Sequence, residues 1–385
     1  MFSGVLQTNY HGYPRPTAIV LSVVTVLVAY ALYAGTTLWF FKQLVLTSEH
    51  DRSRAVFIAG GAAVAAAAAG ALAVRAYVER ATFGYDGTQY LGADVQAITP
   101  VNRFYVVTKN IADPAVERGA WRLAIDGAVE RSSIYDMDQL AQMGTVVQET
   151  TLMCISNEVA GGLMSNAKWS GVRLRDVISA AGPMAGVRKV SFHAVDNYVD
   201  TISFDKAMEP TTLIAFRMNS EELPARHGFP ARMIVPGMFG EKNVKWISRV
   251  SLETTDVKGF YERQGWGPDF SIPTHSRFDA PDFTRPLARG RTVELRGVAF
   301  AGNRGVSRVE VSTDGGRSWV DASFVSPYGA LIWRLWRFDW RPATPGRHEL
   351  VVRATDSHGE LQIAADRPTA PHGATGFHRV TAHVS

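Results

Sequence analysis

Two long uncharged apolar stretches lie near the start of the chain. Residues 17–41 contain no Asp, Glu, Lys or Arg, are rich in Val, Leu and Ile, and end in an aromatic cluster before Lys42. Such a stretch is long enough to span a bilayer, and aromatic residues followed by a lysine are typical of an interfacial end. Residues 55–74 are also uncharged but consist mostly of Ala and Gly, which suit close packing against another helix. We therefore predict transmembrane helices at about 17–41 and 55–78.

The charges around these stretches predict an orientation. Lys42, Arg52 and Arg54 lie in the short connection between them, which favours a cytoplasmic position for that loop. The rest of the chain would then face the extracytoplasmic side of the cell membrane, which the protein would cross twice. The alternatives for the second stretch are the apolar region of an export signal and a soluble Ala-rich helix.

After a polar, Gly-rich linker at 79–99, the pattern changes to that of a mixed α+β domain over 100–288. Short apolar or alternating runs bounded by turn residues predict strands, and an amphipathic period predicts helices. Strands are expected at 104–107, 121–125, 146–155, 190–195, 212–218, 231–235 and 245–252, and helices at 135–143 and 172–181. Gly182 should stop the second helix, and residues 254–286 should have little regular structure.

Residues 289–385 show a different pattern, with short alternating strands separated by turns. The strands expected at 293–298, 308–312, 333–340 and 349–354 predict a β-sandwich. Trp333, Trp336 and Trp340 lie on one of these strands. Packing in a core or interface is the favoured interpretation, and a sugar-binding platform is the alternative.

Composition excludes several function classes. The net charge of +4 is spread along the chain without a Lys/Arg block, which argues against nucleic-acid binding. Cys154 is the single cysteine, so the chain has neither an intrachain disulfide framework nor a Cys-rich zinc pattern. Neither predicted span contains a histidine and no Cys-x-x-Cys-His sequence occurs, so we expect no haem in this chain.

Cys154 is the residue around which the candidate chemistry gathers. It stands at the end of the predicted strand 146–155, where a polar, Gly-rich loop begins. A rigid strand end followed by a loop is a common position for functional side chains. The thiol could be a nucleophile, a redox group or a soft metal ligand, and the alternative is an inert buried cysteine.

Two further segments are rich in polar and cationic residues. Residues 100–110 carry the sequence Asn-Arg-Phe-Tyr, and residues 227–246 place His227, Arg232 and Lys245 around one loop, strand and loop. Such a cationic group suits a phosphate or another anion, because Arg offers a planar fork of donors and Lys a point charge. The alternative is a solvated basic loop.

Taken together, these segments resemble the sulfite oxidase family of molybdenum-cofactor enzymes, from about residue 100 to the C-terminus. Cys154 stands in Thr-Leu-x-Cys-x-x-Asn, which matches the family's metal-binding cysteine. His-Gly-x-Pro-x-Arg at 227–232 and Asn-Val-Lys-Trp at 243–246 match its pterin-holding segments. The resemblance implies an α+β fold with a sulfite-oxidase-like molybdopterin-binding domain and an immunoglobulin-like β-sandwich through which the chain forms a homodimer. The two predicted transmembrane helices would precede it.

The resemblance also implies roles for individual residues. A single pyranopterin would carry molybdenum bound by Cys154, with Lys109 and Trp169 beside it in the reaction pocket. The implied cofactor-binding residues are Asn102, Tyr105, Val106, Cys154, His193, His227, Arg232, Asn243, Val244 and Lys245. A soft thiolate suits a redox-active transition metal, while the protein fixes geometry and screens water.

The residues after Cys154 depart from the family pattern. Sulfite-oxidising members carry two arginines there, whereas this chain has Glu158 and Val159. A pocket tyrosine of the family corresponds to Val257. A pocket with fewer positive charges and an added acid should bind the sulfite dianion poorly, so sulfite is not the expected substrate.

The expected function is that of a membrane-anchored molybdenum-cofactor oxidoreductase. It would transfer an oxygen atom to or from a small or protein-borne sulfur- or nitrogen-containing substrate and exchange electrons with a separate cytochrome or quinone-linked partner. The nearest alternative is a sulfoxide or N-oxide reductase supplied by a membrane quinol partner. A cofactor-free, membrane-tethered binding protein is the alternative from a different class.

Overall fold

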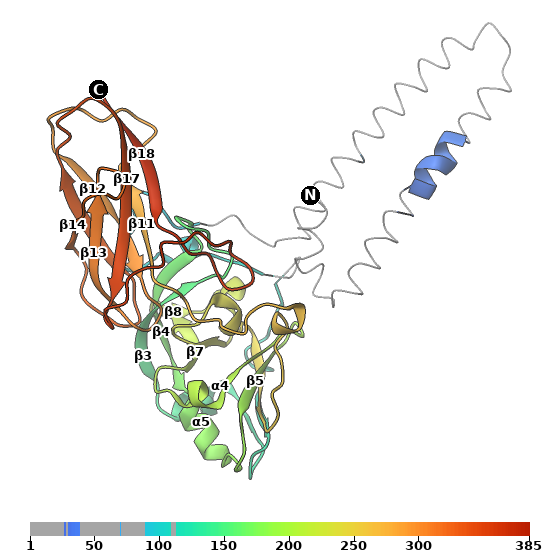
Figure 1. Cartoon of the computed structure of the whole chain (residues 1–385). Coiled ribbons are helices and arrows are strands. Elements are labelled where there is room, and N and C mark those ends of the chain that lie inside the picture. Colours follow the sequence, from blue (N-terminus) through green and yellow to red (C-terminus); the bar gives the residue numbers. More distant parts are fainter. Residues whose placement is uncertain (1–26, 28–29, 39–69, 71–88, 109–112) are drawn as a thin grey trace, which may run out of the picture. The chain divides into compact units, whose positions relative to one another are not determined.

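The computed structural model of the chain describes residues 27, 30–38, 70, 89–108 and 113–385 (Figure 1). Of the two predicted transmembrane helices, only residues 27, 30–38 and 70 are described. Within the described residues, no helix is both long and apolar enough to cross a membrane. The chain divides into two compact units, residues 1–85 with 107–113 and residues 86–106 with 114–385. The elements that follow belong to the second unit.

One sheet of this unit has five strands in the order β2-β1-β10-β5-β6. Strands β1 and β10 run parallel, and the other neighbours are antiparallel. The strands are β1 (Leu123–Gly127), β2 (Ser133–Tyr135), β5 (Lys189–Ala194), β6 (Val199–Ser203) and β10 (Ile247–Glu253). Because β10 lies between β1 and β5, the chain returns to the middle of this sheet after building the second one.

The second sheet carries Cys154 at one strand end. Its order is β3-β4-β7-β8, β9 also pairs with β7, and every pair is antiparallel. The strands are β3 (Val146–Met153), β4 (Met164–Arg173), β7 (Leu213–Met218), β8 (Glu221–Glu222) and β9 (Arg232–Ile234). Strand β4 lies between β3 and β7, and its residues 164–171 pair with the whole of β3. The loop after Cys154 is therefore the turn of a long hairpin.

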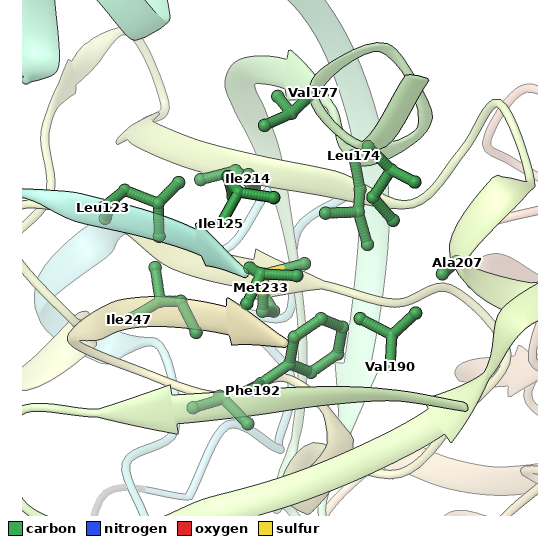
Figure 2. Close-up of a cluster of buried hydrophobic side chains, with 14 of the residues drawn as sticks. Leu123, Ile125, Leu174, Val177, Val190, Phe192, Ala207, Ile214, Met233 and Ile247 are labelled. Carbon is green, nitrogen blue, oxygen red and sulfur yellow. The ribbon is translucent and has the colours of Figure 1, made fainter. Parts of the chain in front are cut away.

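Short helices accompany the two sheets. They are α4 (Met137–Gln142), α5 (Leu174–Ala181) and α6 (Phe204–Met208), with 3-10 turns η1 (Val101–Arg103), η2 (Ala225–His227), η3 (Gly240–Lys242) and η4 (Glu262–Gln264). Helix α5 buries the apolar stripe that a 3.6-residue period predicts, and Gly182 ends it in a left-handed conformation at φ 70°. Figure 2 shows Leu174 and Val177 in the same buried cluster as Ile214 and Phe192.

The C-terminal part is a β-sandwich, drawn in orange to red in Figure 1. Two four-stranded sheets, β11-β12-β16-β15 and β14-β13-β17-β18, share one buried core. The strands are β11 (His275–Ala280), β12 (Val293–Phe300), β13 (Val306–Ser312), β14 (Val320–Asp321), β15 (Ser323–Phe324), β16 (Arg334–Trp340), β17 (Gly346–Asp356) and β18 (His378–Val384). Trp333, Trp336 and Trp340 are 1%, 0% and 7% exposed, so the packing interpretation is confirmed and the sugar platform is excluded.

Several sequence predictions were wrong in local structure. Residues 104–107 form no strand, because they leave η1 in an extended segment and the Tyr105 N–H donates to the Ser165 hydroxyl, 3.2 Å away. The helix expected from 172 begins at Leu174, since β4 continues to Arg173. The segment 254–286, expected to be irregular, contributes η4 and the sandwich strand β11. In each case pairing with distant residues decides the outcome.

Candidate active site

Cys154 follows directly after β3 and is held by backbone hydrogen bonds. Its N–H donates to the Leu163 carbonyl at 3.0 Å, and its own carbonyl accepts the Asn157 N–H at 3.0 Å. The Ser156 N–H points at the sulfur, 3.4 Å from Sγ. The thiol is free and 7% exposed. A strand end and a tight turn therefore fix the position of the one cysteine.

Residues of the β-sandwich pack against this strand end. Met153 and Ile155, on either side of Cys154, lie in one buried cluster with Phe300 and Trp333. The Trp333 backbone N–H donates to the Thr151 hydroxyl at 2.9 Å. The C-terminal part is thus packed against the segment that positions the thiol.

A cationic group lies in the same part of the molecule. The Arg232 guanidinium is 5% exposed and donates to the carbonyls of His227 and Asn243 at 3.0 and 3.1 Å. Among the residues that the structure describes, no carboxylate lies within ion-pair distance of it. Burial lowers the pKa of Arg232 to about 10, so the group keeps its positive charge at neutral pH. A buried charge of this kind is stabilised by an anionic ligand.

Phe104 joins the cationic group to the segment that carries Tyr105. Its ring stacks on Tyr105 at 5.4 Å and meets Trp169 and His227 edge-on at 5.6 and 5.4 Å. The Arg232 guanidinium lies over the Trp169 ring at 5.1 Å. Residues far apart in the sequence therefore form one continuous cluster.

His227 is neutral in this cluster. Its Nε2 lies 3.2 Å from the Val101 carbonyl, which can only accept, so Nε2 carries the proton. Burial, followed by the nearby charge of Arg232, lowers the pKa of His227 to about 3. The Nδ1 atom then remains a hydrogen-bond acceptor.

Residues 243–245 form hydrogen bonds that fix the conformation of the neighbouring loops. The Asn243 side chain accepts the Val235 N–H at 2.7 Å and donates to the carbonyls of Met238 and Phe239 at 3.2 and 3.0 Å. The Val244 carbonyl accepts the Met233 N–H at 2.8 Å. Lys245 Nζ donates to the Arg226 carbonyl at 3.0 Å. Asn243 is thus occupied with fixing the loop.

At the thiol end, the 3-10 turn η3 approaches Cys154. A Cβ on Gly240 would lie 3.0 Å from the Tyr105 hydroxyl and 3.6 Å from the Cys154 Cα. Lys242 Nζ pairs with Asp200 at 2.6 Å, and both side chains are buried. The sequence predictions missed Glu241, Lys242 and Asp200, although the charged pair inside the Gly-x-x-Asn-Val-Lys segment was a visible signal.

Burial and nearby charges raise the pKa values of Cys154 and Tyr105. Burial, followed by the charge of Glu241, raises the pKa of the Cys154 thiol to about 12, and the Ser156 N–H opposes the rise. Burial, together with the charges of Cys154 and Glu241, raises the pKa of Tyr105. Without a metal the thiol is therefore protonated, and a bound cation would favour the thiolate.

The other predicted site residues lie in different settings. Asn102 is exposed in η1, Val106 is buried beside Tyr105, and Trp169 is fully buried with its indole N–H on the Thr150 carbonyl at 3.1 Å. His193 lies on β5, 3.2 Å from Arg249, with no contact to the cluster recorded among the described residues. Lys109 lies outside the described residues. The roles of these residues remain predictions.

The cluster fits a molybdopterin with its metal at Cys154 and its anionic tail at Arg232. One end offers a soft sulfur ligand, and the other a buried guanidinium that no described carboxylate neutralises. Gly228 has φ +109°, and a Cβ there would lie 3.0 Å from the Arg232 Cβ and 3.1 Å from the Lys245 Cβ. The glycine therefore keeps the backbone close to the cationic group.

Comparisons with known proteins agree with this geometry. The profile of the oxidoreductase molybdopterin binding domain matches residues 110–261, and that of the Mo-co oxidoreductase dimerisation domain matches 279–384. Sulfite oxidase of Gallus gallus is 31% identical over 315 residues, covering 69% of this chain and 68% of that protein. Mitochondrial sulfite oxidase of Macaca fascicularis is 32% identical over 313 residues. The chain spans 57% of the length of that relative.

A solved structure supports the fold. The sulfane dehydrogenase SoxCD from Paracoccus pantotrophus matches with a TM-score of 0.67 and 22% identity, over 76% of this chain and 85% of that one. The sequence relatives, the two matched domains and the site geometry agree on one assignment. The chain belongs to the sulfite oxidase family of molybdopterin-binding oxidoreductases.

Proposed function

We propose that this chain is an oxidoreductase that transfers an oxygen atom to or from a small or protein-borne sulfur- or nitrogen-containing substrate, with sulfur compounds favoured. The observation that carries the proposal is one cluster with a fixed thiol at one end and, at the other, a buried guanidinium that no described carboxylate neutralises. The Arg232 guanidinium lies over Trp169, whose ring meets Phe104, and Phe104 stacks on Tyr105. Gly240 lies beside both the Tyr105 hydroxyl and Cys154. When bound, molybdopterin supplies a metal centre that changes its oxidation state by two electrons.

The protein's own residues hold and shield that centre. Cys154 provides the metal ligand, and the Ser156 N–H donates to its sulfur. Arg232 supplies charge for the anionic tail, and neutral His227 offers an acceptor for a pterin N–H. Burial of Tyr105 and Trp169 excludes water, which strengthens each of these polar interactions.

The residues at the family's substrate-pocket positions favour a substrate other than sulfite. Glu158 is exposed on the loop after Cys154, and Val159 and Val257 are half-buried. None of them can donate a charged hydrogen bond to an oxyanion. The same feature supports the second candidate, a sulfoxide or N-oxide reductase, because an uncharged S=O or N-oxide group needs no arginine to neutralise it.

The cellular setting is part of the proposal. The apolar stretches 17–41 and 55–78 support a membrane anchor, with the enzyme on the extracytoplasmic side and electrons passing to or from a separate cytochrome or quinone-linked partner. The match to a dimerisation domain supports a homodimer through the C-terminal sandwich. Protease added to intact cells should cut the enzyme. Cleavage that occurs only after lysis would refute this orientation.

Metal and pterin content test the proposal directly. The purified full chain should contain about one molybdenum by mass spectrometry and a matching amount of fluorescent oxidised pterin. Cys154→Ser should abolish turnover while leaving the free energy of unfolding within about 1 kcal/mol of that of the parent, because the sulfur is replaced by a group of similar shape. A preparation from cofactor-producing cells that contains neither molybdenum nor pterin would refute the proposal.

A further inference from the structure

The loop that follows Cys154, residues 155–163, carries two of the family's substrate-pocket positions. It connects β3 to β4 and contains Glu158 and Val159. The Gly161 N–H donates to the Glu158 carbonyl at 2.9 Å, and Ala160 has a left-handed φ of 68°. A residue with a Cβ is strained in this conformation and keeps it only where the surrounding structure fixes the backbone. The loop therefore depends on contacts with other segments.

The end of this loop is hydrogen-bonded to the backbone of Cys154. The Leu163 carbonyl accepts the Cys154 N–H at 3.0 Å, and the Leu163 N–H donates to the Asn157 side chain at 2.8 Å. The Asn157 N–H in turn donates to the Cys154 carbonyl at 3.0 Å. A shift of residues 161–163 would therefore reach both the N–H and the carbonyl of the cysteine.

A segment that precedes the first strand lies along the same loop. The Tyr90 N–H donates to the Gly162 carbonyl at 2.9 Å, and the Gly162 N–H donates to the Gln89 side chain at 3.2 Å. A Cβ on Gly162 would lie 2.7 Å from the Gln89 Cβ, so this close approach requires a glycine. Tyr90 is fully buried, and its ring stacks on Trp333 at 6.0 Å. The loop is thus attached to a well-packed part of the protein.

One buried guanidinium group joins these segments. Arg277 lies in β11 of the sandwich and is 3% exposed. Its Nη1 donates to the Gly161 carbonyl at 2.7 Å, its Nη2 to the Tyr90 carbonyl at 2.8 Å and its Nε to the Asp279 carboxylate at 2.9 Å. The same Asp279 oxygen accepts the Gly92 N–H at 3.1 Å. Each nitrogen of the guanidinium group therefore has an acceptor, and the three acceptors belong to three different segments of the chain.

We propose that Arg277 is a positioning residue of the active site, which fixes the loop 155–163 and, through it, the sulfur of Cys154 and two substrate-pocket positions. The inference rests on the proposed function, because it takes Cys154 to be the metal ligand. A guanidinium group presents its donors in one fixed plane, so its three hydrogen bonds define where the Gly161 carbonyl lies. A lysine is a single point charge and cannot serve the same three acceptors in this geometry.

Hydrogen exchange of the full-length holoenzyme tests whether Arg277 fixes the loop. Arg277→Lys keeps a positive charge for Asp279, so the protein should fold, but the three-way bridge to Gly161 and Tyr90 is lost. Peptides that cover residues 155–163 should exchange their amide hydrogens at least about tenfold faster than in the wild type, because local opening of the loop becomes easier. Peptides that cover β17 should exchange at the wild-type rate.

The metal reports whether the loop also positions the sulfur. The EPR spectrum of the holoenzyme, after one-electron reduction with dithionite, depends on the direction from which the cysteine sulfur binds molybdenum. Arg277→Lys should therefore shift the g-values. Arg353→Lys is the matched control, because Arg353 in β17 pairs with the buried Glu310 in β13 at 2.9 Å. This control should lose a similar amount of stability in urea and keep the wild-type spectrum and loop exchange.

A second variant covers the case in which Arg277→Lys does not fold. Arg277→Met combined with Asp279→Asn leaves no unpaired buried charge and should give the same faster exchange and shifted spectrum. Loop exchange at the wild-type rate, or an unchanged spectrum, would overturn the inference. Equal shifts in Arg353→Lys would also overturn it, because a general loss of stability would then explain them. A wild-type chain that contains neither molybdenum nor pterin refutes the proposed function itself, so the two failures are distinguishable.

Discussion

The buried ion pair behind the active site gives the sharpest stability prediction. Lys242 Nζ lies 2.6 Å from the Asp200 carboxylate, and these side chains are 2% and 0% exposed. The ammonium group also lies 3.8 Å above the Phe270 ring. Replacing Lys242 by Met keeps much of the side-chain volume and removes the charge. Asp200 would then be a buried carboxylate without its cation.

The expected loss of stability follows from the contacts that remain. Removing one partner of a buried ion pair costs about 3–5 kcal/mol. Asp200 still receives the Tyr198 hydroxyl at 2.6 Å and the Thr201 N–H at 2.8 Å, which limits the loss. Protonation sets a ceiling, because neutralising an aspartate with an unfolded-state pKa near 3.9 at pH 7 costs ~4 kcal/mol. We therefore expect a loss of about 3–4 kcal/mol at pH 7.

The pH dependence of this loss provides a second signature. Burial already raises the pKa of Asp200, and Lys242 opposes that rise. Without Lys242 the pKa of Asp200 in the folded protein rises further above its unfolded value. The unfolded chain then releases its proton first as pH increases, so the loss of stability grows above about pH 4 and shrinks as pH falls toward it.

Urea unfolding of the full chain, followed by tryptophan fluorescence at pH 4.5 and pH 7, measures both effects. Arg379→Met is the matched control, because Arg379 and Glu349 form an ion pair at 2.9 Å with both side chains about half exposed. That variant should lose less than about 1 kcal/mol. Asp200→Asn combined with Lys242→Met should recover part of the loss at pH 7. A loss below 1 kcal/mol in Lys242→Met, or one independent of pH, would refute the reasoning.

Three further predictions concern the sandwich, the cationic group and assembly. Burial lowers the pKa of His378 to about 4, so the unfolded chain protonates first and stability should fall as pH drops from about 6.5 toward 4. In His378→Asn the free energy of unfolding should depend less on pH in this range, with a slope smaller by up to about one bound proton, and a slope equal to that of the wild type would contradict the prediction. Gly228→Ala should reduce the amount of bound pterin, because the new Cβ would lie 3.0 Å from the Arg232 Cβ. Gly186 also has a positive φ but has open space around it, so the control variant Gly186→Ala should keep its pterin. Light scattering should give the mass of a dimer, and a monomer at micromolar concentration would argue against assembly through the sandwich.

Much of the fold is determined by local sequence patterns. The strand predicted at 146–155 is observed as β3, which ends at Met153 and leaves Cys154 directly beyond its end. Helix α5 buries its 3.6-residue stripe and stops at Gly182. The change to short alternating strands in the C-terminal part also corresponds to the observed sandwich. These features depend on residues a few positions apart, which a sequence displays directly.

Only the tertiary structure decides which charges and donors meet. Lys242 and Asp200 are 42 positions apart, and His227 reaches the Val101 carbonyl across 126 positions. The apolar residues 104–107 suggest a strand, yet their partners are a hydroxyl and aromatic rings rather than a neighbouring strand. Whether a buried carboxyl such as that of Glu241 is paired depends on which distant segments surround it. Hydrogen bonds and charge compensation are short-range in space, so sequence spacing alone cannot predict them.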